Sequence, residues 1–446
     1  MADQERGTSR QPRFHVVNLG CKVNRVESDT MAASCIAAGA EPCELDRADV
    51  VIVNTCTVTA EADAKTRKSI RHAAGLCRGP VIVTGCAAAI DPEQLQSLAP
   101  NVIVEPVQFK ASKIAVDALK AVGSGIGGMA TGIVTSADDP TPESLKIESP
   151  EAIRIRATDN FKTRMDIKIQ DGCENACTYC IVHVARGEAR SVPLRTVVDE
   201  VSVASESNVG EVVLTGINLG GYDDHGIRLP KLVSAILEET PIGRVRISSI
   251  EPQHVTSELL EVLSENPGRL CAHFHIPLQS GCDKTLAEMG RGYDSEAYLK
   301  MVHELRSVRP DVAISTDVIA GFPGETDEDF EQSYEFCRRV GFSRMHVFRY
   351  SRRPGTPAAE RSDQVDSEVM SIRAQRLRSL SKEMQADDIR RRIGNVEQVL
   401  MMSSQKGMSE SYHDVVSEKP LERGALLRMR LEGVDEEGRL LGAPLD

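Results

Sequence analysis

The sequence contains no tryptophan, and aromatic residues make up only 4% of its 446 positions. It also has no apolar run near the roughly 20 residues that a membrane-spanning helix needs, which excludes a helical integral membrane protein. Residues 1–12 are polar and lack the apolar centre of a secretory signal, so we expect a disordered arm and a cytoplasmic protein. Because disulfides are rare in that compartment, the twelve cysteines indicate metal binding or redox chemistry.

The net charge of −13 does not favour a nucleic-acid partner, but a net value hides local distribution. Residues 344–392 contain 11 Arg and one Lys against seven acidic residues, an excess of five positive charges. Such an excess is typical of a solvated helix face and also of a surface that contacts an anionic polymer. Charge alone leaves both interpretations open.

Three cysteines near the middle of the chain have Cys-x3-Cys-x2-Cys spacing: Cys173, Cys177 and Cys180. They follow an alternating run at 164–170, which predicts a strand whose end carries a loop with three thiols. A closed structural zinc site takes four ligands, whereas a [4Fe-4S] cluster held by three thiolates keeps one iron open for another ligand. The alternatives are a zinc knuckle and buried apolar thiols, and the count of three ligands favours the cluster over both.

Residues 13–120 place three more cysteines directly after predicted strands. The strands are expected at 14–18, 50–53 and 81–83, and the cysteines that follow them are Cys21, Cys56 and Cys86. Apolar strands that alternate with helical patterns, here 27–39 and 60–74, predict a parallel α/β sheet. The ends of parallel strands share one edge, so the three thiols are expected to converge. We interpret them as ligands of a second [4Fe-4S] cluster for sulfur transfer; electron relay is the alternative.

Residues 121–155 are rich in glycine, proline and acidic residues and are expected to form a linker. Gly123, Gly125 and Gly128 formally match a dinucleotide-binding fingerprint. That fingerprint follows a strand and opens a helix, but here it follows a helical pattern at 112–122. We therefore reject it as a coincidence of linker composition.

Residues 156–383 return to strand–helix alternation at longer spacing, which predicts a partial barrel of six βα units. The strands are expected at 164–170, 211–215, 244–249, 272–277, 313–319 and 345–349. Ligand-binding residues of such barrels collect after the strands. The candidates in those loops are Asn218, Ser249, Glu251 and Gln279, and loop capping is the competing explanation for each.

The C-terminal part changes pattern again. A helix is expected at 367–392, with apolar residues on one face and arginines opposite. Within residues 384–446 we then expect short strands at 396–402, 412–416 and 425–431. Short strands in about 55 residues are typical of a small β-barrel of the oligonucleotide-binding kind.

Together these motifs resemble the methylthiotransferase family of radical S-adenosylmethionine (SAM) enzymes, from residue 14 onward. The resemblance implies an N-terminal α/β domain, a radical SAM barrel and a C-terminal TRAM domain associated with RNA binding. It implies that Cys173, Cys177 and Cys180 hold the SAM-binding [4Fe-4S] cluster, with Tyr179 among the SAM contacts. It also implies that Cys21, Cys56 and Cys86 hold an auxiliary [4Fe-4S] cluster.

Three segments are most similar to the branch that methylthiolates C2 of N6-threonylcarbamoyladenosine at tRNA position 37. They are Leu19-Gly20-Cys21-Lys22-Val23-Asn24, Asn54-Thr55-Cys56-Thr57-Val58-Thr59 and Val213-Leu214-Thr215-Gly216-Ile217-Asn218-Leu219-Gly220. Branches that act on isopentenyladenosine-37 or on a ribosomal-protein aspartate usually read Phe-Gly-Cys-Gln-Met-Asn or Gly-Cys-Pro-Lys-Asn at the first segment. Both remain as alternatives within the family. A non-catalytic RNA-binding protein that holds zinc in both cysteine sets is the alternative of a different class.

The reaction that the resemblance implies consumes two SAM molecules. One is cleaved reductively, and its radical removes the C2 hydrogen of the modified adenine. Sulfur held at the auxiliary cluster then attaches to that carbon, and the second SAM supplies the methyl group. The implied partners are the tRNA anticodon loop, SAM, a flavodoxin- or ferredoxin-like electron donor and a sulfur source, with no membrane.

Overall fold

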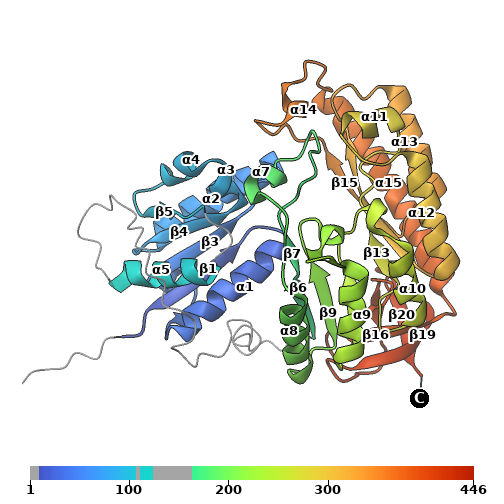
Figure 1. Cartoon of the computed structure of the whole chain (residues 1–446), viewed down its shortest axis with the longest axis horizontal. Coiled ribbons are helices and arrows are strands. Elements are labelled where there is room, and N and C mark those ends of the chain that lie inside the picture. The colour runs from blue at the N-terminus through green and yellow to red at the C-terminus, as the bar shows by residue number, and fades with distance from the viewer. Residues whose placement is uncertain (1–9, 107–110, 124–162, 446) are drawn as a thin grey trace, which may run out of the picture. The chain divides into compact units, whose positions relative to one another are not determined.

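A computed structural model of the chain describes residues 10–106, 111–123 and 163–445 (Figure 1). It divides into two compact units, and each is considered by itself. The first comprises residues up to 159 together with 184–186, and the second comprises 160–183 and 187–446. Most of the arm predicted at 1–12 and of the linker predicted at 121–155 lies outside the described residues. The domain boundaries given above stay predictions.

The first unit contains a sheet of five parallel strands, as the sequence predicted. The sheet order is β2-β1-β3-β4-β5. These strands are β1 (Arg13–Asn18), β2 (Glu41–Pro42), β3 (Val50–Thr55), β4 (Val81–Gly85) and β5 (Val102–Val104). In this flavodoxin-like order the direction of winding reverses between β1 and β3, and ligands of open α/β sheets bind at that point.

Helices cover both faces of this sheet because its central strands are apolar on both sides. On one face, Val50 and Ile52 pack in a core with Met31 of α1 (Lys22–Ala37) and Ile114 of α5 (Ala111–Gly123). The other face packs against α2 (Ala60–Leu76), α3 (Cys86–Ile90) and α4 (Pro92–Gln96). Cys35 and Cys77 are buried in these two cores, so they serve packing.

The helix expected at 27–39 begins earlier than predicted. It starts at Lys22, directly after Cys21, whose extended backbone forms the N-cap. Val23 and Val26 are buried and extend the packed face of the helix toward this end. Their contribution was hidden by the polar residues between them, so the predicted start was wrong by five positions.

The second unit contains six parallel strands in chain order, which confirms the predicted partial barrel. They form two three-stranded sheets, β6-β9-β12 and β13-β14-β15. Parallel bridges from Val245 to Leu270 and from Ser249 to His275 join the two sheets. The strands are β6 (Arg164–Lys168), β9 (Glu211–Thr215), β12 (Arg244–Ile247), β13 (His273–His275), β14 (Ala313–Ala320) and β15 (Arg344–Arg349).

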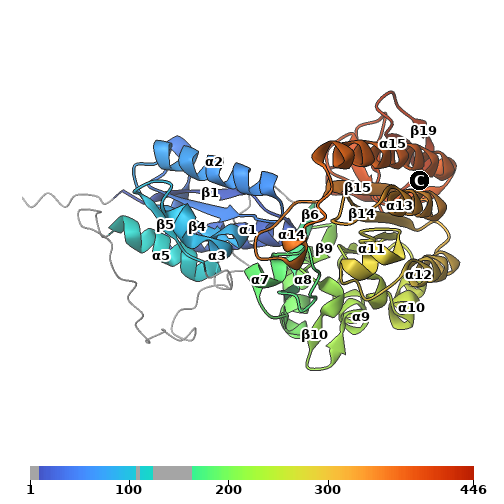
Figure 2. The ribbon, with the colours of Figure 1, turned by 90° about the horizontal axis from the view of Figure 1, so that it is seen from above.

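Amphipathic helices connect these strands and cover the outside of the barrel (Figure 1). In α13, Thr326 and Asp329 form a capping box, and Gly341 ends the helix with φ of 65°. The longest helix, α15, matches the prediction at 367–392 and packs along β15 (Figure 2). The principal helices are α8 (Leu194–Glu206), α9 (Leu229–Glu239), α10 (Ser257–Glu265), α12 (Ser295–Val308), α13 (Asp327–Val340) and α15 (Ser367–Arg392). Shorter ones are α7 (Val182–Arg186), α11 (Asp283–Glu288) and α14 (Pro357–Glu360).

The C-terminal strands close into a small barrel, in the order β16-β17-β18-β20-β19. This confirms the predicted barrel, and two of its strands, β17 and β20, were missed. Its core contains Val399, Met401, Met429 and Leu431. The strands are β16 (Val396–Met401), β17 (Lys406–Ser409), β18 (Asp414–Val416), β19 (Leu426–Val434) and β20 (Leu440–Pro444).

A buried charged cluster fixes the C-terminal barrel against the N-terminal ends of the larger barrel's strands. The Glu211 carboxylate pairs with Arg244, with Arg246 at 2.9 Å and with Arg164 at 2.7 Å. Arg244 also donates to the carbonyl oxygens of Gln398 and Met408 in the small barrel. Burial alone would raise the pKa of Glu211, but the arginines outweigh burial and hold that pKa well below its ordinary range.

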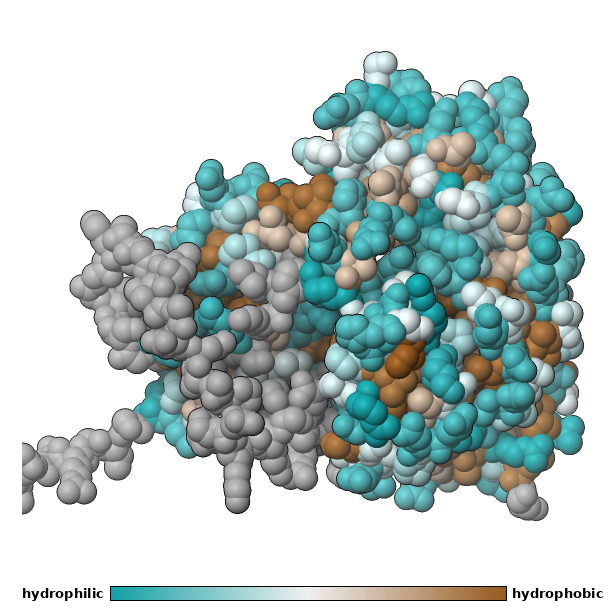
Figure 3. All heavy atoms as spheres, viewed as in Figure 1, coloured by the Kyte–Doolittle hydropathy of each residue, from teal (hydrophilic) through white to brown (hydrophobic). Residues whose placement is uncertain are grey.

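Among the described residues, no helix is long and apolar enough to cross a membrane. On the face drawn in Figure 3, hydrophobic residues form small groups among hydrophilic ones. Several large aromatic side chains are instead fully buried, such as Phe14, Phe274 and Phe342.

Candidate functional site

The loop between β7 (Gln170–Asp171) and α7 brings Cys173, Cys177 and Cys180 together. Burial raises the pKa of Cys180 to about 11, and the two neighbouring thiols add to the rise. Backbone N–H groups of Asn175 and Val182 donate to the Sγ atoms of Cys173 and Cys180, each at 3.4 Å. Three adjacent sulfurs with N–H donors fit a [4Fe-4S] cluster, whose binding would displace the thiol protons.

Arg291 lies against this loop and was not identified from the sequence. Its Nη1 donates to Sγ of Cys177 at 3.2 Å, and its Nη2 donates to Oε1 of Glu251 at 2.9 Å. Its Nε donates to the Tyr293 hydroxyl at 3.1 Å. Arg291 stands in the segment Met289-Gly290-Arg291-Gly292-Tyr293, 114 positions after Cys177, so no local feature of the sequence indicated this contact.

Among the residues predicted to contact SAM, Asn218 has the strongest structural support. Its backbone N–H donates to Oε1 of Gln170 at 2.8 Å, while its side-chain Oδ1 is buried with no hydrogen-bond partner in the described structure. Buried acceptors are nearly always paired, so an orphan at a strand end points to a missing ligand. The ligand itself stays a prediction.

The other four candidates have protein partners. Glu251 forms the ion pair with Arg291, and Ser249 pairs through its backbone with His275. Gln279 has φ of 68° and exchanges backbone hydrogen bonds with the β14 segment. Tyr179 packs in an apolar group with Met289, Phe322 and Tyr350. The structure therefore places Ser249, Glu251 and Gln279 at strand ends, and their contact with SAM stays a prediction.

The second set of thiols lies at the carboxyl edge of the five-stranded sheet. Cys21 and Cys56 follow β1 and β3, the strands that flank the switch point, and Cys86 follows β4. The pKa of Cys86 is raised to about 11, mainly by burial; Arg186 lowers it, and the nearby thiols of Cys21 and Cys56 contribute to the rise. The donor set again fits a cluster with one open iron.

Two asparagines from the quoted sequence motifs shape this edge. Nδ2 of Asn24 donates to Oδ1 of Asn54 at 2.9 Å and to the Thr55 carbonyl at 3.0 Å, and Oδ1 of Asn24 accepts from Sγ of Cys21 at 3.3 Å. Gly85 has φ of 93°, and a Cβ there would lie 2.5 Å from Oδ1 of Asn54. The motif residues around the cysteines thus set the backbone that presents the thiols.

Inside the partial barrel, three polar side chains converge that the sequence did not single out: His275, Asp317 and His346. One ligand-type atom from each lies within 4.8 Å of the others. Nε2 of His275 is 3.3 Å from Oδ2 of Asp317, and Nδ1 of His275 is 3.1 Å from Oγ of Ser315. They lie on three neighbouring strands, His275 on β13, Asp317 on β14 and His346 on β15; the first two are half-buried and His346 is exposed.

The positive segment at 344–392 is largely neutralised by local ion pairs. Arg373 pairs with Glu325 and Asp327, and Arg376 pairs with Glu331. Among the exposed arginines, Arg349 donates to a serine hydroxyl and Arg378 donates to a backbone carbonyl. The run therefore combines ion-paired arginines with a few whose charge faces solvent.

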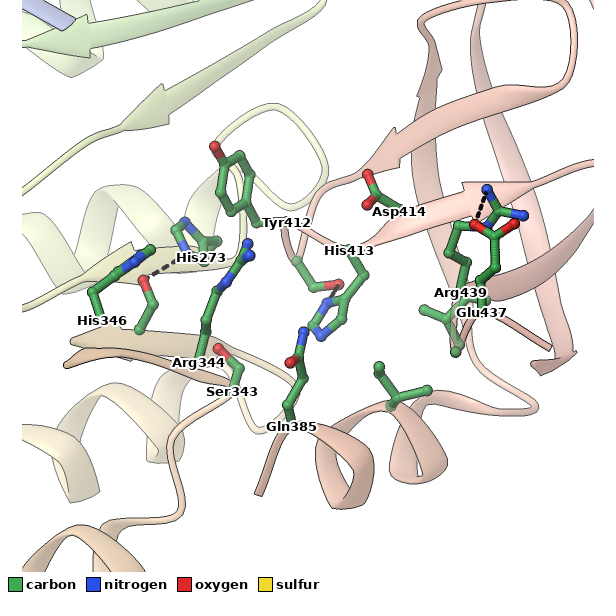
Figure 4. A pocket seen from close by; sticks show the side chains of 15 residues that line it. His273, Ser343, Arg344, His346, Gln385, Tyr412, His413, Asp414, Glu437 and Arg439 are labelled. Atoms are coloured by element: carbon green, nitrogen blue, oxygen red, sulfur yellow. Dashed lines mark hydrogen bonds and ion pairs between the residues drawn. The ribbon is translucent and has the colours of Figure 1, made fainter. Parts of the chain in front are cut away.

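The pocket drawn in Figure 4 lies at the opposite end of the strands from the cysteines. It has a volume of about 150 Å³ and is lined by residues at the starts of β13 and β15, including His273 and Arg344, and by Tyr412 and His413 of the small barrel. Barrel enzymes place their ligands at the carboxyl ends of the strands. We therefore assign this pocket to the junction of the two barrels.

Comparison with known sequences finds two family matches in the chain. Residues 167–337 match the radical SAM superfamily, and residues 13–105 match uncharacterized protein family UPF0004. The threonylcarbamoyladenosine tRNA methylthiotransferase MtaB of Thermotoga maritima is 34% identical over 433 residues, with 95% of each chain covered. A tRNA-2-methylthio-N(6)-dimethylallyladenosine synthase of Endomicrobium trichonymphae is 30% identical and covers 89% of this chain and 90% of its own.

Among solved structures, the radical SAM methyltransferase TsrM of Kitasatospora setae, with cobalamin and a [4Fe-4S] cluster bound, has a TM-score of 0.56. The alignment covers 78% of this chain and 77% of that one at 16% identity. At this identity the likeness concerns the fold alone.

Proposed function

Because the chain belongs to the methylthiotransferase family of radical SAM enzymes, we propose that it adds a methylthio group to C2 of N6-threonylcarbamoyladenosine at position 37 of tRNA. The observation that carries the proposal is the 34% identity to the T. maritima threonylcarbamoyladenosine enzyme over 95% of both chains. The six cysteines in two converging sets support the same reaction class.

In this proposal Cys173, Cys177 and Cys180 hold the SAM-binding [4Fe-4S] cluster, and Cys21, Cys56 and Cys86 hold the auxiliary one. When bound, these groups supply the electron, the radical and the sulfur for the reaction. The chain orients them. Asn218 offers its unpaired Oδ1 to SAM, Arg291 donates to Cys177, and Tyr179 closes the cysteine loop against the apolar group around Met289.

The interior of the partial barrel supports the threonylcarbamoyl substrate over an isopentenyl one. The threonylcarbamoyl group carries a carboxylate, a hydroxyl and a urea, all of which need hydrogen-bond partners. His275, Asp317 and His346 offer donors and acceptors for these groups, whereas an isopentenyl substituent has no polar atom that could pair with them. Isopentenyladenosine-37 and a ribosomal-protein aspartate are the alternative substrates.

The remaining parts of the proposal concern partners. The C-terminal barrel serves as a TRAM domain that binds the tRNA, and exposed arginines such as Arg349 and Arg378 contact phosphates of the anticodon region. An external flavodoxin- or ferredoxin-like protein delivers electrons, and a separate sulfur source replenishes the auxiliary site. We place the enzyme in the cytoplasm.

Mass spectrometry of tRNA nucleosides from a deletion strain tests the substrate. We expect the 2-methylthio-threonylcarbamoyl nucleoside to disappear and the unthiolated nucleoside to accumulate. Loss of the isopentenyl derivative instead would assign the chain to the other tRNA branch. A colourless, zinc-loaded protein after anaerobic purification would support the non-catalytic alternative and overturn the proposal.

Two cysteine variants separate the proposed roles of the clusters. Cys173→Ala should abolish reductive SAM cleavage. Cys56→Ala should leave cleavage measurable and stop sulfur insertion, and normal thiolation by that variant would remove the sulfur-carrier role from the auxiliary site.

A further inference from the structure

A fully buried arginine, Arg186, belongs to the first unit and lies beside Cys86, one of its three predicted ligand thiols. Its Nη1 donates to Oε1 of Glu27 at 2.6 Å, and its Nη2 donates to Oε2 at 3.3 Å. Glu27 is also buried, on α1. A buried charge is strongly unfavourable unless it is paired, so the two side chains depend on each other.

The same guanidinium reaches the thiols. Its Nε donates to Sγ of Cys86 at 3.3 Å. Its Nη2 donates to Oδ1 of Asn24 at 3.0 Å, and that oxygen also accepts from Sγ of Cys21 at 3.3 Å. Arg186 therefore contacts one predicted ligand directly and a second through Asn24.

Two physical effects follow for a cluster at these thiols. Hydrogen bonds to the sulfurs and the local charge help to set the reduction potential of an iron–sulfur cluster. A cluster gains negative charge when it is reduced, and a cation buried beside it stabilises the reduced form because the surroundings screen charge poorly. Glu27 opposes that effect by balancing the arginine.

We infer that Arg186 is a positioning residue that raises the reduction potential of the auxiliary cluster, and that Glu27 limits the rise. The inference rests on the proposed function in one respect, namely that Cys21, Cys56 and Cys86 hold this cluster. It goes beyond that function by assigning the ion pair a redox role that simple packing would not have.

The test isolates the auxiliary cluster by replacing Cys173, Cys177 and Cys180 with alanine in the full chain. After anaerobic reconstitution, an EPR-monitored redox titration gives the midpoint potential. In this background Arg186→Gln should lower the ratio of reduced to oxidised cluster at least tenfold at a fixed potential, a shift of about 59 mV to more negative values. Glu27→Gln should shift the potential in the opposite direction, because the arginine charge is then unbalanced.

Opposite signs for the two partners of one ion pair distinguish a redox role from a structural one, since loss of structure would affect both alike. Arg25→Gln is the matched control. Arg25 lies on the same helix, is exposed and pairs with Asp29, so its loss should leave the potential unchanged. Arg186→Lys keeps the charge and should shift the potential less than Arg186→Gln.

If the single variants fail to hold iron, the double variant Arg186→Met with Glu27→Met removes both charges together. It should bind the cluster at a lower potential, because the N–H donor to Cys86 is gone. Unchanged potentials in all variants would overturn the inference and leave the proposed function standing. Loss of the cluster in every variant would also overturn the inference, because the ion pair of Arg186 and Glu27 would then have a purely structural role. Absence of any cluster in the alanine background would instead refute the auxiliary site itself.

Discussion

Arg291 lies between Cys177 and Glu251, donating from Nη1 to the sulfur at 3.2 Å and from Nη2 to the carboxylate at 2.9 Å. Arg186 has the same relationship to Cys86 and Glu27. At each three-cysteine site, therefore, an arginine that donates to a thiol is balanced by a glutamate. Thiolate-rich sites need such nearby cations because each ligand must lose its proton.

Replacing Arg291 with methionine should slow reductive SAM cleavage at least tenfold. The change removes the donor to Cys177 and leaves the Glu251 carboxylate without its ion-pair partner. Formation of 5′-deoxyadenosine with a chemical reductant measures the effect, and iron content shows whether the cluster is still present. Arg195→Met is the control, because Arg195 is exposed on α8 and pairs with Glu239 at the end of α9. An unaltered rate and EPR spectrum would contradict the prediction.

Replacing Glu211 with glutamine should destabilise the second unit by about 3–5 kcal/mol. The neutral side chain leaves Arg164, Arg244 and Arg246 close together in a buried position without their shared carboxylate. The loss of stability is measured as the shift in the midpoint of denaturant unfolding between wild type and variant, both prepared without iron–sulfur clusters. Glu239→Gln removes an exposed carboxylate and should change the midpoint little. Equal midpoints for Glu211→Gln and Glu239→Gln would show that the ion pairs of Glu211 do not hold the two barrels together.

Lowering the pH should weaken the attachment of the C-terminal barrel to α15, because Asp388 of that helix pairs with His413 of the barrel. Burial alone would raise the pKa of Asp388, but hydrogen bonding to His413 and the charge of Arg392 hold it well below its ordinary value of 3.8. A carboxyl whose pKa is lowered by folding stabilises the fold above its unfolded-state pKa, and this stability is lost as pH falls toward the folded-state pKa. Wild type should therefore exceed Asp388→Asn in stability near neutral pH, and the difference should shrink below about pH 4. A difference that does not vary with pH would contradict this. Asp387→Asn, at an exposed ion pair, is the control.

Arg349→Ala and Arg378→Ala should each weaken tRNA binding and reduce the salt dependence of binding by roughly one unit in the log–log slope. Both side chains are exposed, and both donate to neutral groups. Arg376→Ala, on the same helix as Arg378 but paired with Glu331, should have a smaller effect. Fluorescence anisotropy with labelled tRNA at several salt concentrations measures the slopes. Equal slopes for all three variants would place the tRNA elsewhere.

His346→Leu should reduce kcat/KM for threonylcarbamoyladenosine tRNA by roughly 10- to 100-fold, because the substituent loses a hydrogen-bond partner. The same change should affect isopentenyladenosine tRNA less or favour it. His303→Leu, on α12 away from the barrel interior, serves as the control. Equal losses on both substrates would show that the group formed by His275, Asp317 and His346 does not read the substituent.

The sequence predicted the elements whose apolar pattern is continuous. Val50–Val53 and Val81–Val83 could form only buried strands, and three cysteines after such strands had to share an edge of the sheet. The strands of the larger barrel were found instead from the alternation of strand and helix patterns, beginning with the alternating run at 164–170. β17 and β20 were missed because Lys406–Ser409 is mostly polar and Leu440–Pro444 contains glycine and proline, residues that usually mark turns.

The arginines at the two cysteine sites could not be predicted, because nothing local marks them. Arg291 follows Cys177 by 114 positions, and Arg186 follows Cys86 by 100. Their partners are set by tertiary packing, and a glycine-rich or helical neighbourhood in sequence gives no sign of a contact with sulfur. The same holds for His275, Asp317 and His346, which come from three different strands.

The two cysteine sets also differ in how much of the chain must be in place before they exist. Cys173, Cys177 and Cys180 fall within one short loop, so even a nascent chain could capture iron there, since little loop-closure entropy opposes it. Cys21, Cys56 and Cys86 each follow a different strand, and they meet only after β1, β3 and β4 have paired. Under the proposed function, the auxiliary site can therefore receive its metal only after these three strands have paired, whereas the loop site depends on no sheet.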